Sequence, residues 1–243
     1  MFLGLPCAEL AEIAALSGLD FIVLDGEHGR IPPQGIYPLL TAAKAQNQAL
    51  SVYYRLPEPS AQAAALAMDQ AVDGIVIPQV INAEQVRRII KATRFAPLGE
   101  RGVHPAVRAA QYGLRAREDY LKSANHESTI IAQVEGEAAM HELPEILSCA
   151  GLDAIFVGPY DLSQSLGVPG QVEHPLVQSA LQTIAQTAYQ HRVPYGTFAG
   201  TKTAIAKAKE LGYSFMALSI DTLLISQAML SLVENARQTD QQA

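Results

Sequence analysis

The sequence contains no tryptophan, only two cysteines and few aromatic residues, which make up 6% of its 243 positions. Two cysteines are too few for a disulfide framework, so we expect Cys7 and Cys149 to be packing residues in a reducing compartment. With so few aromatic side chains, the hydrophobic core must come from Ala, Leu, Ile and Val, which supply most of the 49% of apolar residues.

Long apolar runs and an excess of positive charge are also missing. No run approaches the roughly 20 residues that a membrane helix needs, and no basic segment follows Met1 as in a secretory signal. The formal net charge of -7 argues against nucleic acid or an anionic membrane as a partner. We therefore expect a soluble, cytoplasmic protein without nucleic-acid or membrane partners.

Short apolar segments rich in β-branched residues alternate regularly with segments of helical period. The former are nearly continuous in hydrophobicity, which is typical of parallel strands buried on both faces. The predicted strands are residues 2–5, 21–24, 51–54, 74–77, 129–132, 154–157, 195–198 and 215–218. The predicted helices are residues 7–17, 36–45, 61–70, 83–94, 137–149, 175–191, 201–211 and 221–237, with an extra helix between 95 and 125.

This alternation predicts a (β/α)8 TIM barrel that forms one domain over residues 1–243. A doubly wound sheet is the alternative, but no Gly-x-Gly-x-x-Gly follows an early strand, so a dinucleotide-binding version loses its main support.

Polar residues follow several predicted strands at the point where each strand ends. Residues 25–29 (Asp-Gly-Glu-His-Gly) follow the second strand, Arg55 follows the third, residues 133–135 (Gln-Val-Glu) the fifth, and residues 158–161 (Gly-Pro-Tyr-Asp) the sixth. In a barrel these carboxyl ends converge on one functional site.

Glu135 and Asp161 form a candidate pair of metal ligands on neighbouring strand ends. Two carboxylates without a nearby cysteine or second histidine suit Mg²⁺ or Mn²⁺, with Co²⁺ as an alternative. The alternative reading is a helix-capping Asp161 and a solvated Glu135.

His28 and Arg55 are candidate catalytic residues. A histidine with a pKa near 6.5 suits proton abstraction at neutral pH, and a guanidinium at a strand end can hold a developing enolate. The alternatives are a hydrogen-bonded loop histidine and a structural ion pair. No predicted strand ends in lysine, which disfavours a Schiff-base mechanism.

These strand ends, in this order, resemble the class II pyruvate-dependent aldolases, the family that includes 4-hydroxy-2-oxoheptanedioate aldolase and 2-dehydro-3-deoxyglucarate aldolase. The resemblance runs from about Gly4 to Asn235. The matching segments are residues 24–28, 54–55, 76–78, 97–103, 133–135 and 156–163.

The resemblance implies a role for each matching residue. Glu135 and Asp161 would hold the divalent metal, Arg55 would stabilise the pyruvate enolate, and His28 would transfer the proton. The pyruvate carboxylate would bind to Gln133 and to the backbone of Gly158, Pro159, Tyr160 and Asp161. The region of Phe198 would face the aldehyde.

The family also has an acidic partner for the histidine, which matches Asp69 here. Periodicity places Asp69 at the far end of the helix that follows the third strand, away from the barrel mouth. It could act there only across a subunit interface, and Asp25 is the local alternative.

The expected activity is reversible, metal-dependent cleavage of a 4-hydroxy-2-oxoacid to pyruvate and an aldehyde, most similar to 4-hydroxy-2-oxoheptanedioate aldolase. The alternatives are a sugar-acid (2-dehydro-3-deoxy) aldolase, another metal-enolate enzyme such as an oxaloacetate decarboxylase, and a non-catalytic acid-binding protein. The helix at 221–237 is apolar over more than one stripe, and the resemblance implies its exchange between the subunits of a homohexamer.

Overall fold

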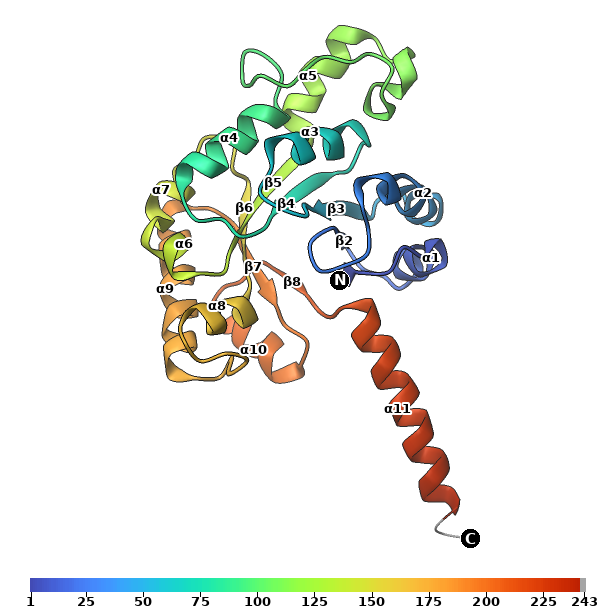
Figure 1. Cartoon of the computed structure of the whole chain (residues 1–243), viewed down its shortest axis with the longest axis vertical. Helices are drawn as coiled ribbons and strands as arrows, with labels where there is room; N and C mark the ends of the chain where they lie inside the picture. The colour runs from blue at the N-terminus through green and yellow to red at the C-terminus, as the bar shows by residue number, and fades with distance from the viewer. Residues whose placement is uncertain (241–243) are drawn as a thin grey trace.

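The computed structural model describes residues 1–240, in which eight parallel strands form one sheet that curves into a nearly closed barrel (Figure 1). The strands lie side by side in chain order. The two edges meet through a parallel bridge between Phe2 and Ile220 and a 3.0 Å hydrogen bond from the N–H of Phe2 to the carbonyl of Ser219. The strands are β1 (Phe2–Leu3), β2 (Phe21–Asp25), β3 (Ser51–Arg55), β4 (Gly74–Ile77), β5 (Thr129–Val134), β6 (Ala154–Val157), β7 (Tyr195–Phe198) and β8 (Phe215–Ala217). The prediction of a (β/α)8 barrel is therefore confirmed, whereas the predicted domain end at residue 243 lies outside the described residues.

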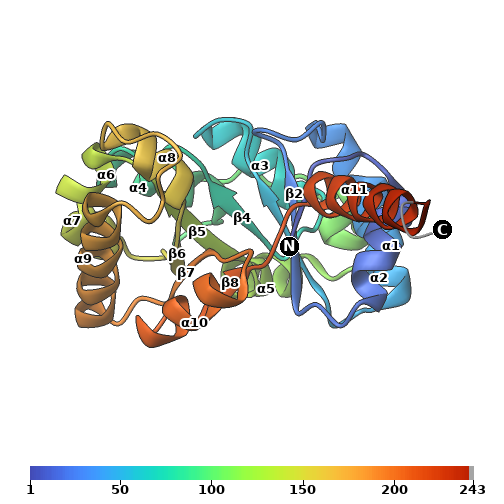
Figure 2. The ribbon, with the colours of Figure 1, turned by 90° about the horizontal axis from the view of Figure 1, so that it is seen from below.

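Helices connect the strands and surround the barrel (Figure 2). They are α1 (Ala8–Leu16), α2 (Ile36–Gln46), α3 (Ala61–Asp69), α4 (Ala83–Thr93), α5 (Arg117–Glu127), α6 (Glu137–His141), α7 (Leu143–Leu147), α8 (Pro159–Ser165), α9 (Pro175–His191), α10 (Lys202–Glu210) and α11 (Asp221–Asp240). Two 3₁₀ segments, η1 (Pro33–Gly35) and η2 (Arg108–Gly113), lie in the connections. Of the helices described, none has the length and apolar character that crossing a membrane requires.

One predicted helix differs from the structure, because residues 137–149 form the two short helices α6 and α7. Glu142 between them has a φ of -92° and a ψ of 6°, which is not helical. Pro144 follows in the first turn of α7, where the lack of a proline N–H is tolerated, whereas one continuous helix would have lost a hydrogen bond there. The short helix α8 was not predicted at all.

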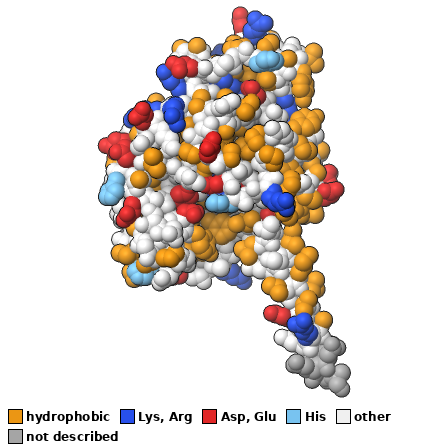
Figure 3. Space-filling model, viewed as in Figure 1, with side chains coloured by type: hydrophobic (Ala, Val, Ile, Leu, Met, Phe, Trp, Pro, Cys, Tyr) orange, Lys and Arg blue, Asp and Glu red, His pale blue; other side chains and the backbone are white. Residues whose placement is uncertain are grey.

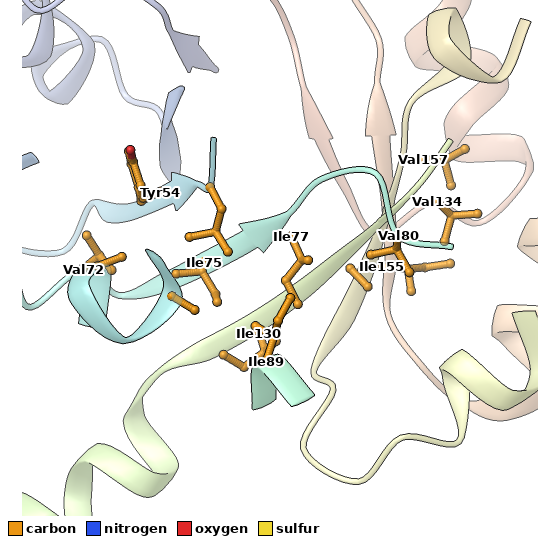
Figure 4. Close-up of a cluster of buried hydrophobic side chains, with 14 of the residues drawn as sticks. Tyr54, Val72, Ile75, Ile77, Val80, Ile89, Ile130, Val134, Ile155 and Val157 are labelled. Carbon is orange, nitrogen blue, oxygen red and sulfur yellow. The ribbon is translucent and has the colours of Figure 1, made fainter. Parts of the chain in front are cut away.

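The barrel strands separate two apolar layers. On β4, Ile75 and Ile77 point outward and pack beneath the helices, in the cluster drawn in Figure 4. Val76 between them points inward and packs with residues from other strands, including Ile131 and Phe156. The continuous hydrophobicity of the strands follows from this burial on both faces.

The last helix, α11, extends away from the barrel (Figure 1). Asp221 at its start is buried, and its carboxylate accepts 3.0 Å hydrogen bonds from the N–H groups of Gly4 and Leu5. Beyond this anchored first turn, the residues from Ser226 to Gln238 are exposed.

Candidate active site

The two-residue period of β5 places its polar residues inside the barrel. Ile131 points into the inner apolar cluster, so Gln133 and Glu135, two and four residues later, point the same way toward the mouth. The same reasoning applies to Asp25, which comes two residues after the inward-facing Val23 on β2. Inner-facing polar residues at strand ends therefore follow directly from the strand pattern.

Arg55 and Asp25 form a buried, two-point ion pair. They are register partners on β3 and β2, and Nε and Nη2 of Arg55 donate to the Asp25 carboxylate at 2.9 and 2.8 Å. The guanidinium lies 4.8 Å from the centre of the Phe2 ring, and its Nη1 is 3.0 Å from Oε2 of Glu27. Arg55 is thus held in place from three sides, with its position fixed before any substrate binds.

The loop after β2 packs closely against β2 and β3, because its two glycines have no side chains that would collide with these strands. A Cβ at Gly26 would overlap the side chain of Tyr54 and the backbone of Arg55, and one at Gly29 would overlap the backbone of Asp25. This close turn brings Glu27 back over the guanidinium of Arg55.

Glu135 is the most perturbed carboxylate of the site. Its Oε1 accepts a 2.6 Å hydrogen bond from the backbone N–H of Gln79, and its Oε2 accepts one from the side-chain amide of Gln133. Burial is the main reason why the pKa of Glu135 is raised to about 7. The negative charges of Glu27 and Asp161 raise this pKa further, whereas the two hydrogen bonds lower it.

Glu27 and Gln79 belong to this cluster and were not predicted. The side chain of Glu27 is 5% exposed, and its Oε1 accepts a 2.8 Å hydrogen bond from Nε2 of Gln79. Gln79 has a φ of 49°, a left-handed conformation that aims its N–H at Glu135 while its amide reaches Glu27. The polar residue after Ile77 and Pro78 was the available signal, because it marks the carboxyl end of β4.

His28 lies at the rim of the site, with its side chain 63% exposed. Its Nε2 is 3.8 Å from Oε2 of Glu27, and its backbone N–H donates to Asp25 at 3.2 Å. The carboxylate of Asp25 is directed at Arg55, so the acidic group that the structure brings to the imidazole is Glu27.

Asp69 lies elsewhere, at the carboxyl end of α3. Its carboxylate is 2.5 Å from Nη2 of Arg101, whose guanidinium lies 4.8 Å from the centre of the Phe95 ring. The end of α3 leads into β4 from the opposite end of the barrel, as predicted, so Asp69 and His28 of one chain are not brought together.

The start of α8 completes the polar side of the site. Gly158 leaves room for the acidic group, since a Cβ there would lie 3.0 Å from Oε2 of Glu135. Asp161 in the first turn of α8 is exposed at the mouth. Residues from both ends of the chain and several strands line an open cavity of about 360 Å³ here. They are Phe2, His28, Arg55, Gln133, Phe156, Gly158, Pro159, Tyr160, Asp161, Phe198, Ile220 and Leu223.

The charges of this site suit a divalent cation. Four carboxylates, those of Asp25, Glu27, Glu135 and Asp161, lie in this site, and the guanidinium of Arg55 pairs with the first two only. Among the described residues no cluster of three or more His, Cys, Asp or Glu could hold a metal by itself. The sequence-predicted pair, Glu135 and Asp161, supplies two carboxylates. That donor set fits Mg²⁺ or Mn²⁺, which keep several positions for water and substrate oxygens. Figure 3 shows acidic side chains and a histidine around a hollow near the middle of this face, bordered by hydrophobic side chains.

Comparison with known proteins agrees with this fold. The model of the family HpcH/HpaI aldolase/citrate lyase matches residues 1–228, and the chain therefore belongs to that family. Its members act on carbon–carbon bonds, so the chain is an enzyme of the aldolase and lyase class.

Two curated relatives and one solved structure show how close the similarity is. A 2-keto-3-deoxy-L-rhamnonate aldolase of Escherichia coli is 36% identical over 230 residues, which cover 94% of this chain and 85% of the relative. A 4-hydroxy-2-oxo-heptane-1,7-dioate aldolase of Shigella boydii is 35% identical over 239 residues, covering 96% and 87%. The crystal structure of a family member from Burkholderia cenocepacia superimposes with a TM-score of 0.92 at 30% identity, over 98% of this chain and 93% of the other.

Proposed function

We propose that the chain is a metal-dependent, pyruvate-using aldolase that reversibly cleaves a 4-hydroxy-2-oxoacid to pyruvate and an aldehyde. One observation carries the proposal: a buried Glu135, held by Gln133 and Gln79, lies among carboxylates beside an immobilised Arg55. Enzymes of this family generally depend on a divalent metal ion. Glu135 and Asp161 would hold that ion here.

The protein residues divide the work of enolate formation. A bound divalent ion would polarise the ketone oxygen of pyruvate and acidify its methyl group. Arg55 then holds the oxygen that becomes negative, and its fixed position avoids reorganisation during the reaction. Gln133 lines the cavity, and its Nε2 uses one N–H on Glu135, so the second N–H would donate to the carboxylate of pyruvate.

His28 is the proposed proton-transfer residue, directly or through a water molecule. It removes a proton from the methyl carbon of pyruvate, and the C–H electron pair becomes the enolate double bond. The enolate carbon then bonds to the aldehyde carbon, and the aldehyde oxygen takes up a proton to give the 4-hydroxyl group. Cleavage follows the same steps in reverse. Oε2 of Glu27, 3.8 Å from Nε2 of His28, is the acidic group nearest to this imidazole.

Assembly with further copies of the chain is part of this proposal. The exposed side chains of α11 include Met229, Leu230, Leu232 and Val233, which are 45–70% exposed. An apolar helix that leaves its own barrel needs a second protein surface to bury it. We assign that surface to another copy of this chain, as in an exchanged hexamer, which would also allow Asp69 of one copy to approach His28 of another.

The decisive experiment measures pyruvate release from a panel of 4-hydroxy-2-oxoacids after EDTA treatment and after addition of Mn²⁺ or Mg²⁺. We expect activity to disappear with EDTA and to return with the metal. Release that is unaffected by EDTA would contradict the metal-dependent mechanism. Oxaloacetate is included because a decarboxylase on the same enolate chemistry would consume it in preference to every aldol substrate.

A further inference from the structure

The cavity at the barrel mouth has two chemically different halves. The polar side chains come from the ends of β2, β3 and β5, namely His28, Arg55 and Gln133. The opposite half is formed by the end of β7, the segment after β8 and the first turn of α11, which contribute Phe198, Ile220 and Leu223. Because the strands lie in chain order around the barrel, these two sets face each other across the mouth.

The second half is apolar throughout the residues that line it. Tyr160 packs edge-on against Phe198 with 6.4 Å between ring centroids, and Phe2 packs against Phe156 at 5.7 Å. Tyr160 supplies the single hydroxyl group among the lining side chains described. A polyhydroxylated sugar chain would leave most of its hydroxyl groups without protein partners on this side.

Positive charge is also missing from this half. Arg55 is the one arginine or lysine among the described lining residues, and Asp25 and Glu27 already neutralise it. The acceptor aldehyde released from 4-hydroxy-2-oxoheptanedioate carries a carboxylate at its far end. That carboxylate would face the apolar side chains of this half.

The first turn of α11 is fixed, so this apolar half belongs to the same chain as the polar half. Hydrogen bonds of 3.0 Å from Gly4 and Leu5 to Asp221 hold that turn against β1, two residues before Leu223. The backbone bridge between Phe2 and Ile220 fixes the neighbouring part of the cavity lining.

Resting on the proposed function, we infer that the acceptor of this enzyme is an uncharged aldehyde with an apolar aliphatic or aromatic substituent. The substituent packs among Tyr160, Phe198, Ile220 and Leu223 while its carbonyl group points at the enolate beside Arg55. This inference differs from the sequence-based expectation of a 4-hydroxy-2-oxoheptanedioate-like substrate, because it favours a 4-hydroxy-2-oxoacid that bears a single carboxylate and an apolar tail.

The test compares aldehydes of similar size in the synthetic direction, with pyruvate and Mn²⁺. We expect kcat/KM for pentanal to exceed that for succinic semialdehyde by at least tenfold, and to exceed that for lactaldehyde. Within the series propanal, butanal and pentanal, each methylene group should raise kcat/KM by up to about fourfold, the ratio that corresponds to roughly 0.8 kcal/mol. Equal or better use of succinic semialdehyde would overturn the inference.

Two matched substitutions locate the effect. Tyr160→Arg places a cation at the apolar half and should raise the ratio of succinic semialdehyde to pentanal use by about tenfold. Tyr189→Arg makes the same change at an exposed position of α9 that does not line the cavity, and it should leave the ratio unchanged. If Tyr160→Arg fails to fold, Phe198→Arg makes the same test. An unchanged ratio in the folded Tyr160→Arg protein would contradict the assignment of the apolar half of the cavity to the aldehyde substituent.

A separate measurement distinguishes failure of the inference from failure of the proposed function. Exchange of the pyruvate methyl protons with deuterium, followed by NMR without any aldehyde, reports enolate formation alone. Metal-dependent exchange combined with a preference for charged aldehydes would overturn the acceptor assignment only. Absence of exchange would instead contradict the proposed pyruvate chemistry.

Discussion

The backbone N–H of Gln79, at the end of β4, donates a 2.6 Å hydrogen bond to Oε1 of Glu135, at the end of β5. The same residue donates from its side chain to Glu27, so one glutamine connects two buried carboxylates. Glu135 is thereby oriented by groups from two strands, as a metal ligand must be for a defined geometry.

We expect Glu135→Gln to reduce metal-dependent pyruvate release by a factor on the order of 10³ or more, because it removes one of the two proposed charged ligands. Asp161→Asn should act in the same way. The matched control is Glu137→Gln, two residues further along on the exposed surface of α6. Calorimetric titration with Mn²⁺ should show binding in the control and none in the two site variants. Normal turnover in Glu135→Gln would remove the metal assignment.

Arg55→Ala should lower kcat by about 10² to 10³, the usual effect of losing one group that stabilises an oxyanion. It should also lower the free energy of unfolding by about 3–5 kcal/mol, because Asp25 and Glu27 lose their buried partner. Arg55→Lys keeps the charge but not the two-point pairing with Asp25, so we expect a smaller loss of stability than in Arg55→Ala together with reduced turnover. Steady-state kinetics and thermal melts measure both quantities. A change confined to the KM of the aldehyde would make Arg55 an acceptor contact instead.

The raised pKa of Glu135, about 7 against 4.5 for the free side chain, predicts how pH affects the metal-free protein. Because the folded pKa is raised, the contribution of this group to stability is present below pH 4.5 and is lost as pH rises through 7, by on the order of 3 kcal/mol. A divalent ion favours the charged carboxylate, so the increase in Tm on adding Mn²⁺ should be larger at pH 8 than at pH 5.5. Glu135→Gln should abolish this pH dependence. An equal increase at both pH values in the parent protein would show that Glu135 does not bind the ion.

The exposed face of α11 predicts self-association. Replacing both Leu230 and Val233, which lie three residues apart on one face, with lysine should dissociate the assembly without unfolding the barrel, because both side chains are exposed in the single chain. Gln238→Lys near the end of the same helix is the control. Analytical ultracentrifugation measures the outcome, and a parent protein that is fully active as a monomer would refute the proposed exchange.

Mixing two inactive variants tests whether sites are shared between copies. Asp69 pairs with Arg101 in its own chain, on the opposite side from His28. If Asp69 serves the histidine of a neighbouring copy, refolding Asp69→Asn together with His28→Ala should restore a measurable fraction of activity through hybrid sites. If the mixture shows no more activity than the two variants measured separately, Asp69 serves only its ion pair with Arg101.

The strands were predictable because burial on both faces leaves continuous apolar runs such as residues 74–77. The split between α6 and α7 was missed because residues 137–149 keep a helical period although Pro144 interrupts the backbone hydrogen bonding. The strand ends also predicted that Arg55, Gln133 and Glu135 lie at one mouth of the barrel, where the candidate site is found.

The remaining site residues depend on three-dimensional detail that spacing does not encode. Nothing in the order Asp25-Gly26-Glu27-His28 shows that Glu27 turns inward and His28 outward, because this follows from how closely the loop packs on Tyr54. Leu223 could not be assigned to the cavity either. Its position depends on the hydrogen bonds that Asp221 accepts from Gly4 and Leu5. These two residues lie more than 200 positions before Asp221 in the sequence.

The anchoring of α11 at Asp221 links aldehyde binding to the concentration of the protein itself. In the proposed assembly, the outer turns of α11 bind a second copy, while its first turn lines the cavity through Leu223. Subunit binding and aldehyde binding would then act on one helix. Thermodynamic linkage then requires reciprocity: if association improves the fit of the cavity to its aldehyde, the aldehyde must tighten association by the same factor. Dilution of the enzyme would consequently change which aldehydes it prefers, in addition to how fast it works.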